Sequence, residues 1–234
     1  MKKQVKEFFC YLIITSFMMM TLTGCSVHSH GDTKTIEDKT NQEITYLEDE
    51  ILTIVNRYSK REYNSDNGIN WDEVSKDVEQ INNSLDTILL DLSDIKISNE
   101  DLINFRNETN NLNIAITKKD EYELMQRCSY LYSLLPGYLE KSSGNNNEVS
   151  TMKLKSLMVS SFVQANFYEW ENAKTTIGIA ETKYKEMMDD VNYMKDYSYN
   201  LNKIYILIEE MKNTIDLQEA DLTRIKYINF IEKI

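Results

Sequence analysis

Two histidines are the first residues of this chain whose type and spacing suggest metal chemistry. His28 and His30 are separated by one residue, and paired imidazoles can ligate a transition metal. They lie in a polar segment without a supporting ligand, and the chain contains only these 2 histidines. We therefore interpret them as part of a tether and predict no metal site there.

A second candidate is the segment at residues 66–70, whose oxygen-bearing side chains and glycine are typical of calcium-binding loops. Aligning Gly68 with the turn glycine of an EF-hand puts Tyr63 where the first carboxylate belongs. Val74 then stands where the bidentate glutamate belongs. Because both ends of the coordination sphere are missing, we interpret this segment as a turn between two helices.

Acidic residues form short runs at residues 48–50, 189–190 and 209–210. Runs of this kind are mostly solvated faces of helices, and we interpret them in this way. Several helices could also bring their carboxylates together around a divalent cation, so this alternative stays open.

The scarcity of histidine limits the catalytic mechanisms open to this chain. A histidine-based triad, a histidine-rich zinc centre and the Glu-x-x-His pairs of di-iron bundles all need imidazoles in the folded region. An enzyme would have to use carboxylate, lysine or tyrosine side chains, and no pair of them stands out in the sequence. We predict a non-catalytic protein without a cofactor.

The N-terminus has the layout of a secretory signal peptide. Lys2, Lys3 and Lys6 are followed by an almost wholly apolar run over residues 8–22. This run is shorter than the roughly 20 residues that a helix needs to cross a bilayer. We therefore expect a segment that directs export and is then removed, in place of a permanent transmembrane span.

The residues Leu22-Thr23-Gly24-Cys25 resemble the lipobox of bacterial lipoproteins, in which a branched apolar residue and two small residues precede a cysteine. The resemblance implies cleavage between Gly24 and Cys25 and transfer of a diacylglycerol to the Cys25 thiol. Two or more acyl chains, such as palmitate, anchor a soluble domain stably where one chain does not. We expect a protein held by lipid at the extracytoplasmic face of the cell membrane, in a bacterium of Gram-positive type.

The chain is strongly acidic, with a formal net charge of -12. Removal of residues 1–24, which contain three lysines and one glutamate, would change this charge to -14. A field of this sign disfavours nucleic acid and is repelled by an anionic lipid surface, so we expect no nucleic-acid partner and a domain that stands off its membrane. Cys10 lies in the predicted signal peptide and Cys25 would carry lipid, which leaves Cys128 without a disulfide partner.

Apolar periodicity divides the rest of the chain into a tether and two helical halves. Residues 25–42 lack this periodicity and are predicted to form a flexible tether that begins with the lipidated cysteine. Beyond them, apolar residues recur at spacings of three and four, as on one face of a helix. The segment 141–150 is rich in Asn, Ser and Gly and is predicted to link helical halves at residues 43–140 and 151–234.

Single residues predict where some helices begin and end. Ser98 begins a capping box, and Asp120 is placed to cap the next helix, which Pro136 is expected to stop or kink. Residues 170–214 could form one helix or two. The apolar stripe slips in phase between Val191 and Tyr197, and we predict a break near residues 189–190. Because the chain shows no β-type alternation, we predict an all-α fold, either an antiparallel helical bundle or stacked helical hairpins.

One segment resembles part of a tetratricopeptide repeat. Residues 168–173, followed by Ile177 and Ala180, match the pattern of the second helix of such a repeat, in which an aromatic residue precedes alternating small and apolar residues. Ser161 stands at the small position of the first helix, but no second copy at the expected period of about 34 residues is visible. The resemblance implies stacked helices and, more weakly, peptide binding.

Tyrosine is abundant, with 15 residues in the chain. Rings at helical spacing usually edge a core, but rings that line a groove suit an interface. The candidate interaction residues are Tyr168, Trp170, Tyr193 and Tyr197. The favoured function is a lipid-anchored, non-catalytic helical domain that binds a protein or peptide partner or has a structural role in the envelope. The alternative is a lipoprotein that binds a ligand or divalent cation as an accessory to a transporter.

Overall fold

The computed structural model describes residues 35–60, 69–142 and 144–234, and over residues 191–201 it describes the backbone alone. In this part of the chain there are eight helices and no strand, which confirms the all-α prediction. Residues 34–234 form one compact unit. The helices are α2 (Ile36–Ser59), α3 (Trp71–Asp94), α4 (Asn99–Lys118), α5 (Glu121–Lys141), α6 (Asn146–Asn166), α7 (Trp170–Asp189), α8 (Val191–Asp216) and α9 (Ala220–Ile231).

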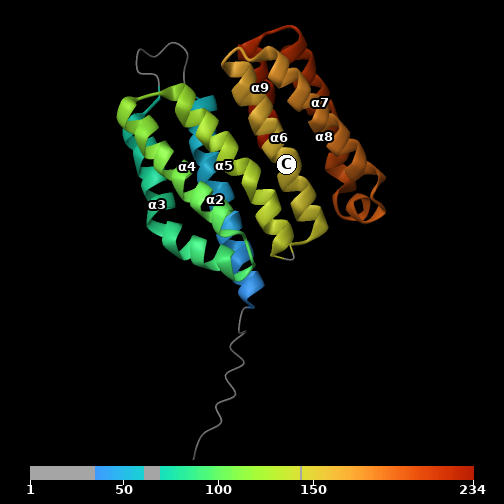
Figure 1. Ribbon diagram of the computed structural model, residues 1–234. Helices are drawn as coiled ribbons and strands as arrows, with labels where there is room; N and C mark the ends of the chain where they lie inside the picture. Colours follow the sequence, from blue (N-terminus) through green and yellow to red (C-terminus); the bar gives the residue numbers. More distant parts are fainter. Residues whose placement is uncertain (1–34, 61–68, 143) are drawn as a thin grey trace, which may run out of the picture. The chain divides into compact units, whose positions relative to one another are not determined.

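The helices pack in two groups of four (Figure 1). In the first group each helix from α2 to α5 contacts the next, and α5 also packs against α2. The second group repeats this arrangement from α6 to α9, with α9 packed against α6. Short connections make sequential helices antiparallel, so each group is a small helical bundle. The two groups join mainly where α5 packs against α6.

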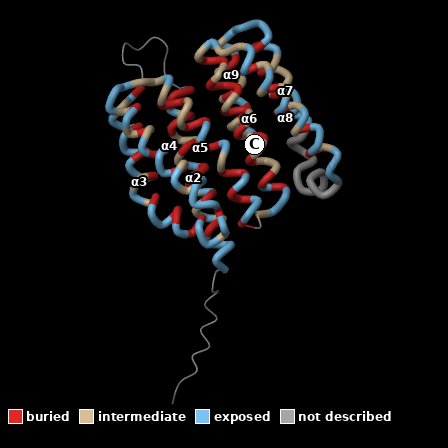
Figure 2. Tube along the Cα trace, in the orientation of Figure 1, coloured by how far each residue is buried: buried red, intermediate tan, exposed pale blue. Residues whose placement is uncertain are grey.

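The helices bury their apolar stripes inside these groups and expose their polar faces (Figure 2). Ile44, Leu47, Ile51 and Ile54 on α2 are each at most 1% exposed. Full burial of one such side chain stabilises the fold by about 1.5–3 kcal/mol. Cys128 is also fully buried, and burial raises the pKa of its thiol well above the usual range.

Several predicted helix boundaries are confirmed. The Ser98 hydroxyl accepts a hydrogen bond from the backbone N–H of Asp101 at 3.1 Å. Asp120 accepts one from the backbone N–H of Glu123 at 3.0 Å. The chain breaks between α7 and α8 at Asp190, as the slip in the apolar stripe predicts.

The predicted tether is too long at its C-terminal end, because α2 begins at Ile36 and not near residue 43. A capping box opens the helix there: Thr35 accepts from the backbone N–H of Asp38 at 3.1 Å, and the Asp38 carboxylate accepts from the Thr35 N–H at 3.4 Å. The first turns are held by polar contacts, which apolar periodicity cannot detect. Thr40 is fully buried, and Lys39 pairs with Asp91 at 2.9 Å.

The predicted linker is also too long, because residues 146–150 belong to α6 and the connection spans only residues 142–145. Pro136 does not stop α5, which continues to Lys141. Proline removes one hydrogen bond of the helix, but Leu135, Tyr138 and Leu139 around it are buried in the core. Their burial outweighs the local cost of the proline.

Four of the helical hairpins close with the same turn. In α3–α4, α4–α5, α6–α7 and α8–α9, one residue adopts the left-handed conformation and the next donates its N–H to a carbonyl five residues earlier. The left-handed residues are Lys96, Lys119, Tyr168 and Gln218, and the N–H to O distances are 3.1 Å for Ile97 to Leu92, 2.9 Å for Asp120 to Ala115, 2.8 Å for Glu169 to Gln164 and 3.0 Å for Glu219 to Thr214. Successive left-handed residues lie 23, 49 and 50 residues apart. These spacings differ from the period of about 34 residues of a tetratricopeptide repeat.

Candidate functional site

The α6–α7 turn places two of the predicted interaction residues together. Tyr168 takes the left-handed position, with a φ of 65°, and its side chain is 71% exposed. Trp170 begins α7 and packs half-buried against the core. The two rings meet edge to face, with centroids 6.0 Å apart. The Tyr168 ring therefore projects into solvent, and the Trp170 ring packs between it and the core.

Glu169, between these two residues, fixes the turn to α5. Its carboxylate accepts a hydrogen bond from the Tyr122 hydroxyl at 3.0 Å and another from the Gln126 amide at 3.0 Å. Asn172 donates a third at 3.1 Å. The hydrogen bond to Glu169 raises the pKa of Tyr122, because the carboxylate favours the phenol over the phenolate.

A chain of ring contacts continues from the surface into the core. The Tyr122 ring meets Phe167 edge to face at 5.1 Å, and Phe167 stacks on Tyr58 at 5.9 Å. Tyr58 contacts Phe162, which stacks on Tyr227 at 4.3 Å. Aromatic contacts of this type contribute roughly 0.5–1.5 kcal/mol each beyond their burial. The surface rings are thus held by rigid neighbours in α2, α5, α6 and α9.

We call Tyr122, Phe167, Tyr168 and Trp170 the aromatic end. It lies at the far end of α6 from the α5–α6 connection, and a helix of 21 residues is about 31 Å long. That connection lies beside the start of α2, because Ser142 hydrogen-bonds to Asn41. The aromatic end is therefore at the opposite end of the helices from the point where the chain enters α2 (Figure 1).

The structure places two of the four predicted interaction residues side by side. Tyr168 and Trp170 lie together, whereas Tyr193 and Tyr197 fall in residues 191–201, whose side chains lie outside the described part. Tyr122 and Phe167 are not among the predicted residues, because only tertiary packing brings α5 against the α6–α7 turn. The one sequence signal for Tyr122 is its place in the first turn of a capped helix.

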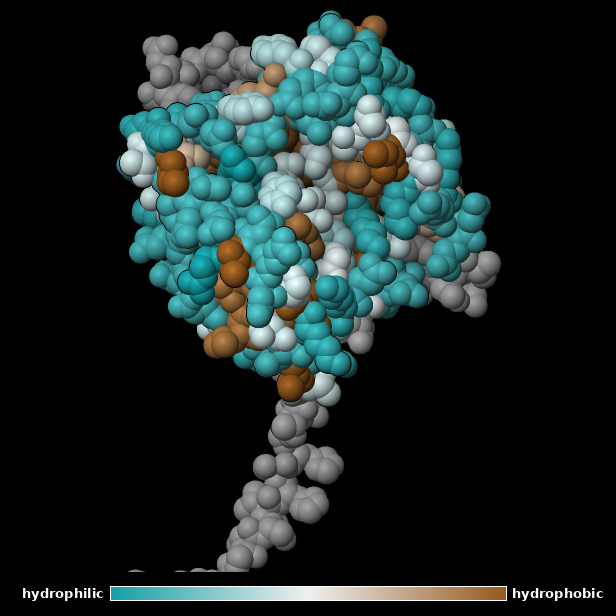
Figure 3. Space-filling model, viewed as in Figure 1, coloured by the Kyte–Doolittle hydropathy of each residue, from teal (hydrophilic) through white to brown (hydrophobic). Residues whose placement is uncertain are grey.

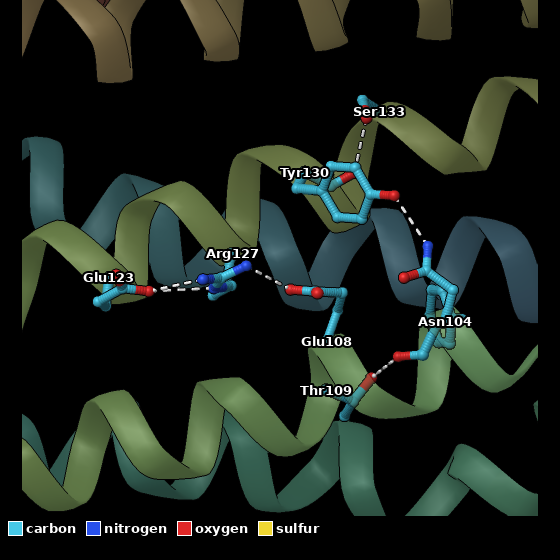
Figure 4. Close-up of polar contacts among 8 residues, drawn as sticks. Asn104, Glu108, Thr109, Glu123, Arg127, Tyr130 and Ser133 are labelled. Atoms are coloured by element: carbon cyan, nitrogen blue, oxygen red, sulfur yellow. Dashed lines mark hydrogen bonds and ion pairs between the residues drawn. The ribbon is translucent and has the colours of Figure 1, made fainter.

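On the face drawn in Figure 3, hydrophobic side chains form separate islands in a mostly hydrophilic surface. The exposed face of α4 and α5 is held by polar contacts (Figure 4): Arg127 lies between Glu123, at 2.9 Å, and Glu108, also at 2.9 Å. Next to it the Asn104 amide donates to the Tyr130 hydroxyl at 2.8 Å. These side chains satisfy one another and tie α4 to α5.

A carboxylate, a lysine and a tyrosine do come together where the two groups of helices meet. Glu48 of α2 accepts hydrogen bonds from the Tyr132 hydroxyl of α5 at 2.7 Å and from the Lys155 ammonium of α6 at 3.2 Å. Glu48 and Lys155 border a pocket of about 260 Å³ that Thr151, Met152 and other residues complete. Burial and the nearby carboxylate raise the pKa of Tyr132 well above its usual value.

The interpretation of residues 48–50 as a solvated face is therefore wrong for Glu48, which is 8% exposed. Glu48 lies four residues after Ile44 and three before Ile51, on the same face of α2, while Asp49 points outward and is exposed. Its phase relative to the apolar stripe is the signal that identifies it. Its partners, 84 and 107 residues away in sequence, leave no such signal.

The described residues contain no group of three or more His, Cys, Asp or Glu side chains arranged to hold a metal ion. The candidate calcium-loop residues Asp66 and Gly68, like His28 and His30, lie outside the described part of the chain. None of the helices in the described part is both long and apolar enough to span a bilayer.

Comparison with known proteins finds no match: no protein-family model fits the chain, and no curated protein and no solved structure is similar to it.

Proposed function

We propose that this chain is a lipoprotein anchored through Cys25, whose helical domain binds a protein or peptide partner with its aromatic end. The observation that carries the proposal is the exposed ring of Tyr168, fixed by Trp170 and by the three hydrogen bonds of Glu169. Rigid aromatic side chains bind partners well because they bury a large area and lose little conformational entropy.

The chain that follows Cys25 enters the helical domain at the start of α2. Ile36, the first residue of α2, follows Cys25 by 11 residues, which span at most about 40 Å when fully extended. The aromatic end lies at the other end of the helices from Ile36. A lipid on Cys25 would thus tether the domain to the membrane through the start of α2, at the other end of the helices from the aromatic end.

Lipidation is tested by mass spectrometry of the protein isolated from membranes. We expect a mature chain that begins at Cys25 and carries a diacylglyceryl group on its thiol. A Cys25→Ala variant should lose the lipid and appear in the medium or keep its signal peptide. A wild-type protein found in the soluble fraction with residues 1–24 still attached would contradict the anchor.

Partner binding is tested by placing a photo-crosslinking amino acid at Tyr168 in the membrane-bound protein. The control position is Leu217, which is equally exposed at 71% and precedes the left-handed residue of the α8–α9 turn. We expect a discrete crosslinked product from position 168 that Trp170→Ala weakens, and no such product from position 217. Equal crosslinking at both positions would show that the aromatic end has no special role.

A second candidate function rests on the pocket beside Glu48. A buried carboxylate and a lysine ammonium at the edge of a 260 Å³ pocket suit a small zwitterionic molecule, which would fit a ligand-binding accessory to a transporter. Titration with a panel of amino acids, followed by thermal unfolding, tests this function. A ligand that raises the melting temperature of the wild-type protein, but not of Lys155→Met, would favour it over partner binding.

A further inference from the structure

An apolar groove of about 420 Å³ runs between the last turns of α3 and the first turns of α4. Its aliphatic lining comes from Leu89, Leu90, Leu102 and Ile103. Leu90 is 68% exposed and Ile103 is 60% exposed, among the highest values for apolar side chains in the described residues. Leu89 is buried and forms the floor. Two antiparallel helices thus offer an open apolar channel to solvent.

The groove lies at the end of the molecule where the chain enters α2. Lys39 in the first turns of α2 pairs with Asp91 of α3 at 2.9 Å, one residue from Leu90. Thr40 also contacts the Asp91 carbonyl, at 3.5 Å. The groove and the aromatic end are therefore at opposite ends of the helices.

Exposed carboxylates outnumber exposed ammonium groups at the open end of this groove, where Lys96 lies between Asp94 and Glu100 in the chain. Asp94 follows Leu90 by four residues and Glu100 precedes Ile103 by three, so each carboxylate neighbours an exposed aliphatic side chain on its own helix. Both acids are exposed and form no ion pair with another described residue. At the other end of the groove, Asp86 pairs with Arg106 at 2.7 Å. The chain as a whole carries a net charge of -12.

We propose that this groove docks a basic amphipathic helix of a partner protein. Such a helix would lay leucine or isoleucine side chains against Leu90 and Ile103, while lysine or arginine at its edges meets Asp94 and Glu100. The inference rests on the proposed partner-binding function and names the chemistry of one partner segment. If Cys25 carries lipid, the tether keeps Ile36, at the same end of the helices as the groove, within about 40 Å of the membrane. The partner segment would then lie close to the membrane surface.

The same acidic residues argue against two other occupants. An anionic lipid surface would be repelled by Asp94, Glu100 and the net negative charge of the domain. A second copy of this chain, packed groove to groove, would bring the same carboxylates against one another at a cost. A basic helix is the occupant that satisfies both the apolar lining and the charge.

The test uses residues 34–234, the compact unit with its own core, and two synthetic peptides of about four helical turns. Both peptides carry leucine on one face, and the other face carries lysine in one and glutamate in the other. We expect the lysine peptide to bind and become helical, as measured by fluorescence anisotropy and circular dichroism. We expect the glutamate peptide not to bind.

The variants separate the groove from general attraction to an acidic protein. Leu90→Ser with Ile103→Ser should weaken binding of the lysine peptide about tenfold or more, as expected for anchor residues at an interface. The control, Ile206→Ser with Leu217→Ser, removes equally exposed apolar groups on α8 and beyond it and should leave affinity within about twofold. The double variant Asp94→Asn with Glu100→Gln should lower the affinity for the lysine peptide and make that affinity less dependent on salt. The double variant Asp49→Asn with Asp216→Asn should have a smaller effect on both quantities.

Several results would overturn the inference. Equal affinity of the groove and control variants would show that the peptide binds elsewhere. Self-association in sedimentation that Leu90→Ser abolishes, or docking to anionic vesicles in preference to the lysine peptide, would assign the groove to another occupant. None of these measurements depends on Cys25 or Tyr168, so failure here is distinguishable from failure of the proposed function. Circular dichroism of each variant confirms that its helices are intact.

Discussion

At the scale of residues, two carboxylates hold helices together by accepting hydrogen bonds from more than one helix. Glu169 joins the start of α7 to α5, and Glu48 joins α2 to α5 and α6. Glu48 is the more buried of the two, so its removal should lower the free energy of unfolding by more. A buried donor that loses its acceptor must keep an unsatisfied polar group away from water.

Glu48→Ala should lower the free energy of unfolding by about 2–4 kcal/mol, because Lys155 and Tyr132 lose their shared acceptor. Its neighbour Asp49 is exposed and offers a matched control: Asp49→Ala should change the free energy by no more than about 0.5 kcal/mol. Urea unfolding followed by circular dichroism measures both. Similar effects of the two substitutions would show that the contacts of Glu48 contribute little.

At the scale of elements, the connection between α5 and α6 is tightly packed. A Cβ atom on Gly144 would lie 2.6 Å from the Leu139 side chain and 2.7 Å from its carbonyl oxygen. The Gly144 N–H also donates to that carbonyl at 2.9 Å. This glycine lets the chain turn directly over the end of α5, which places α6 against α5 and so joins the two groups of helices.

Gly144→Ala should lower the free energy of unfolding by about 1–3 kcal/mol, because Leu139 is buried and its backbone cannot move aside. Gly178→Ala is the control, since no atom outside the neighbouring backbone of α7 lies within 4 Å of the added methyl group. That substitution should raise the free energy of unfolding by up to about 1 kcal/mol, through better helix propensity. Thermal and urea unfolding of the two variants should therefore shift in opposite directions.

At the scale of the whole molecule, buried tyrosines should make the fold sensitive to alkali. Burial raises the pKa of Tyr132, Tyr138 and Tyr227 in the folded protein, because the phenolate cannot be solvated there. A raised pKa in the folded state means that the folded protein holds these protons more tightly than the unfolded chain. The stability they contribute is complete below the unfolded pKa of about 10 and is lost as the pH rises above it.

The free energy of unfolding should accordingly fall steeply above about pH 10. A Tyr132→Phe variant removes one of the three groups, so its stability should fall less steeply with pH, even though it starts lower through loss of the hydrogen bond to Glu48. Urea unfolding at a series of alkaline pH values measures the slopes. Identical slopes for the two proteins would show that Tyr132 does not contribute to the loss.

The molecule carries its two candidate binding surfaces at separate places. The aromatic end and the apolar groove between α3 and α4 lie at opposite ends of the helices. One compact unit could therefore engage two partners at once, one near the start of α2 and one far from it. Because α5 packs against α6, the helices that carry the two surfaces share one continuous hydrophobic core.

The sequence by itself determined the features that depend on neighbouring residues. Apolar spacing of three and four determined the all-α fold, and single side chains such as Ser98 and Asp120 determined helix starts, because a cap acts within one turn. The slip in the apolar stripe located the break before α8. The lipobox resemblance at Cys25 is also local and remains a prediction from sequence.

Only the tertiary structure decided which residues far apart in the chain meet. In the tertiary structure α5 continues beyond Pro136, Glu48 is buried and contacts Lys155, and Tyr122 contacts the α6–α7 turn. Each of these outcomes depends on the free energy of contacts between separate helices, and the identity of the contacting partners leaves no periodic trace in the sequence. The free energy of local helix propensity is smaller than the free energy of burying side chains between helices. The packing of the helices therefore decided where the candidate sites lie.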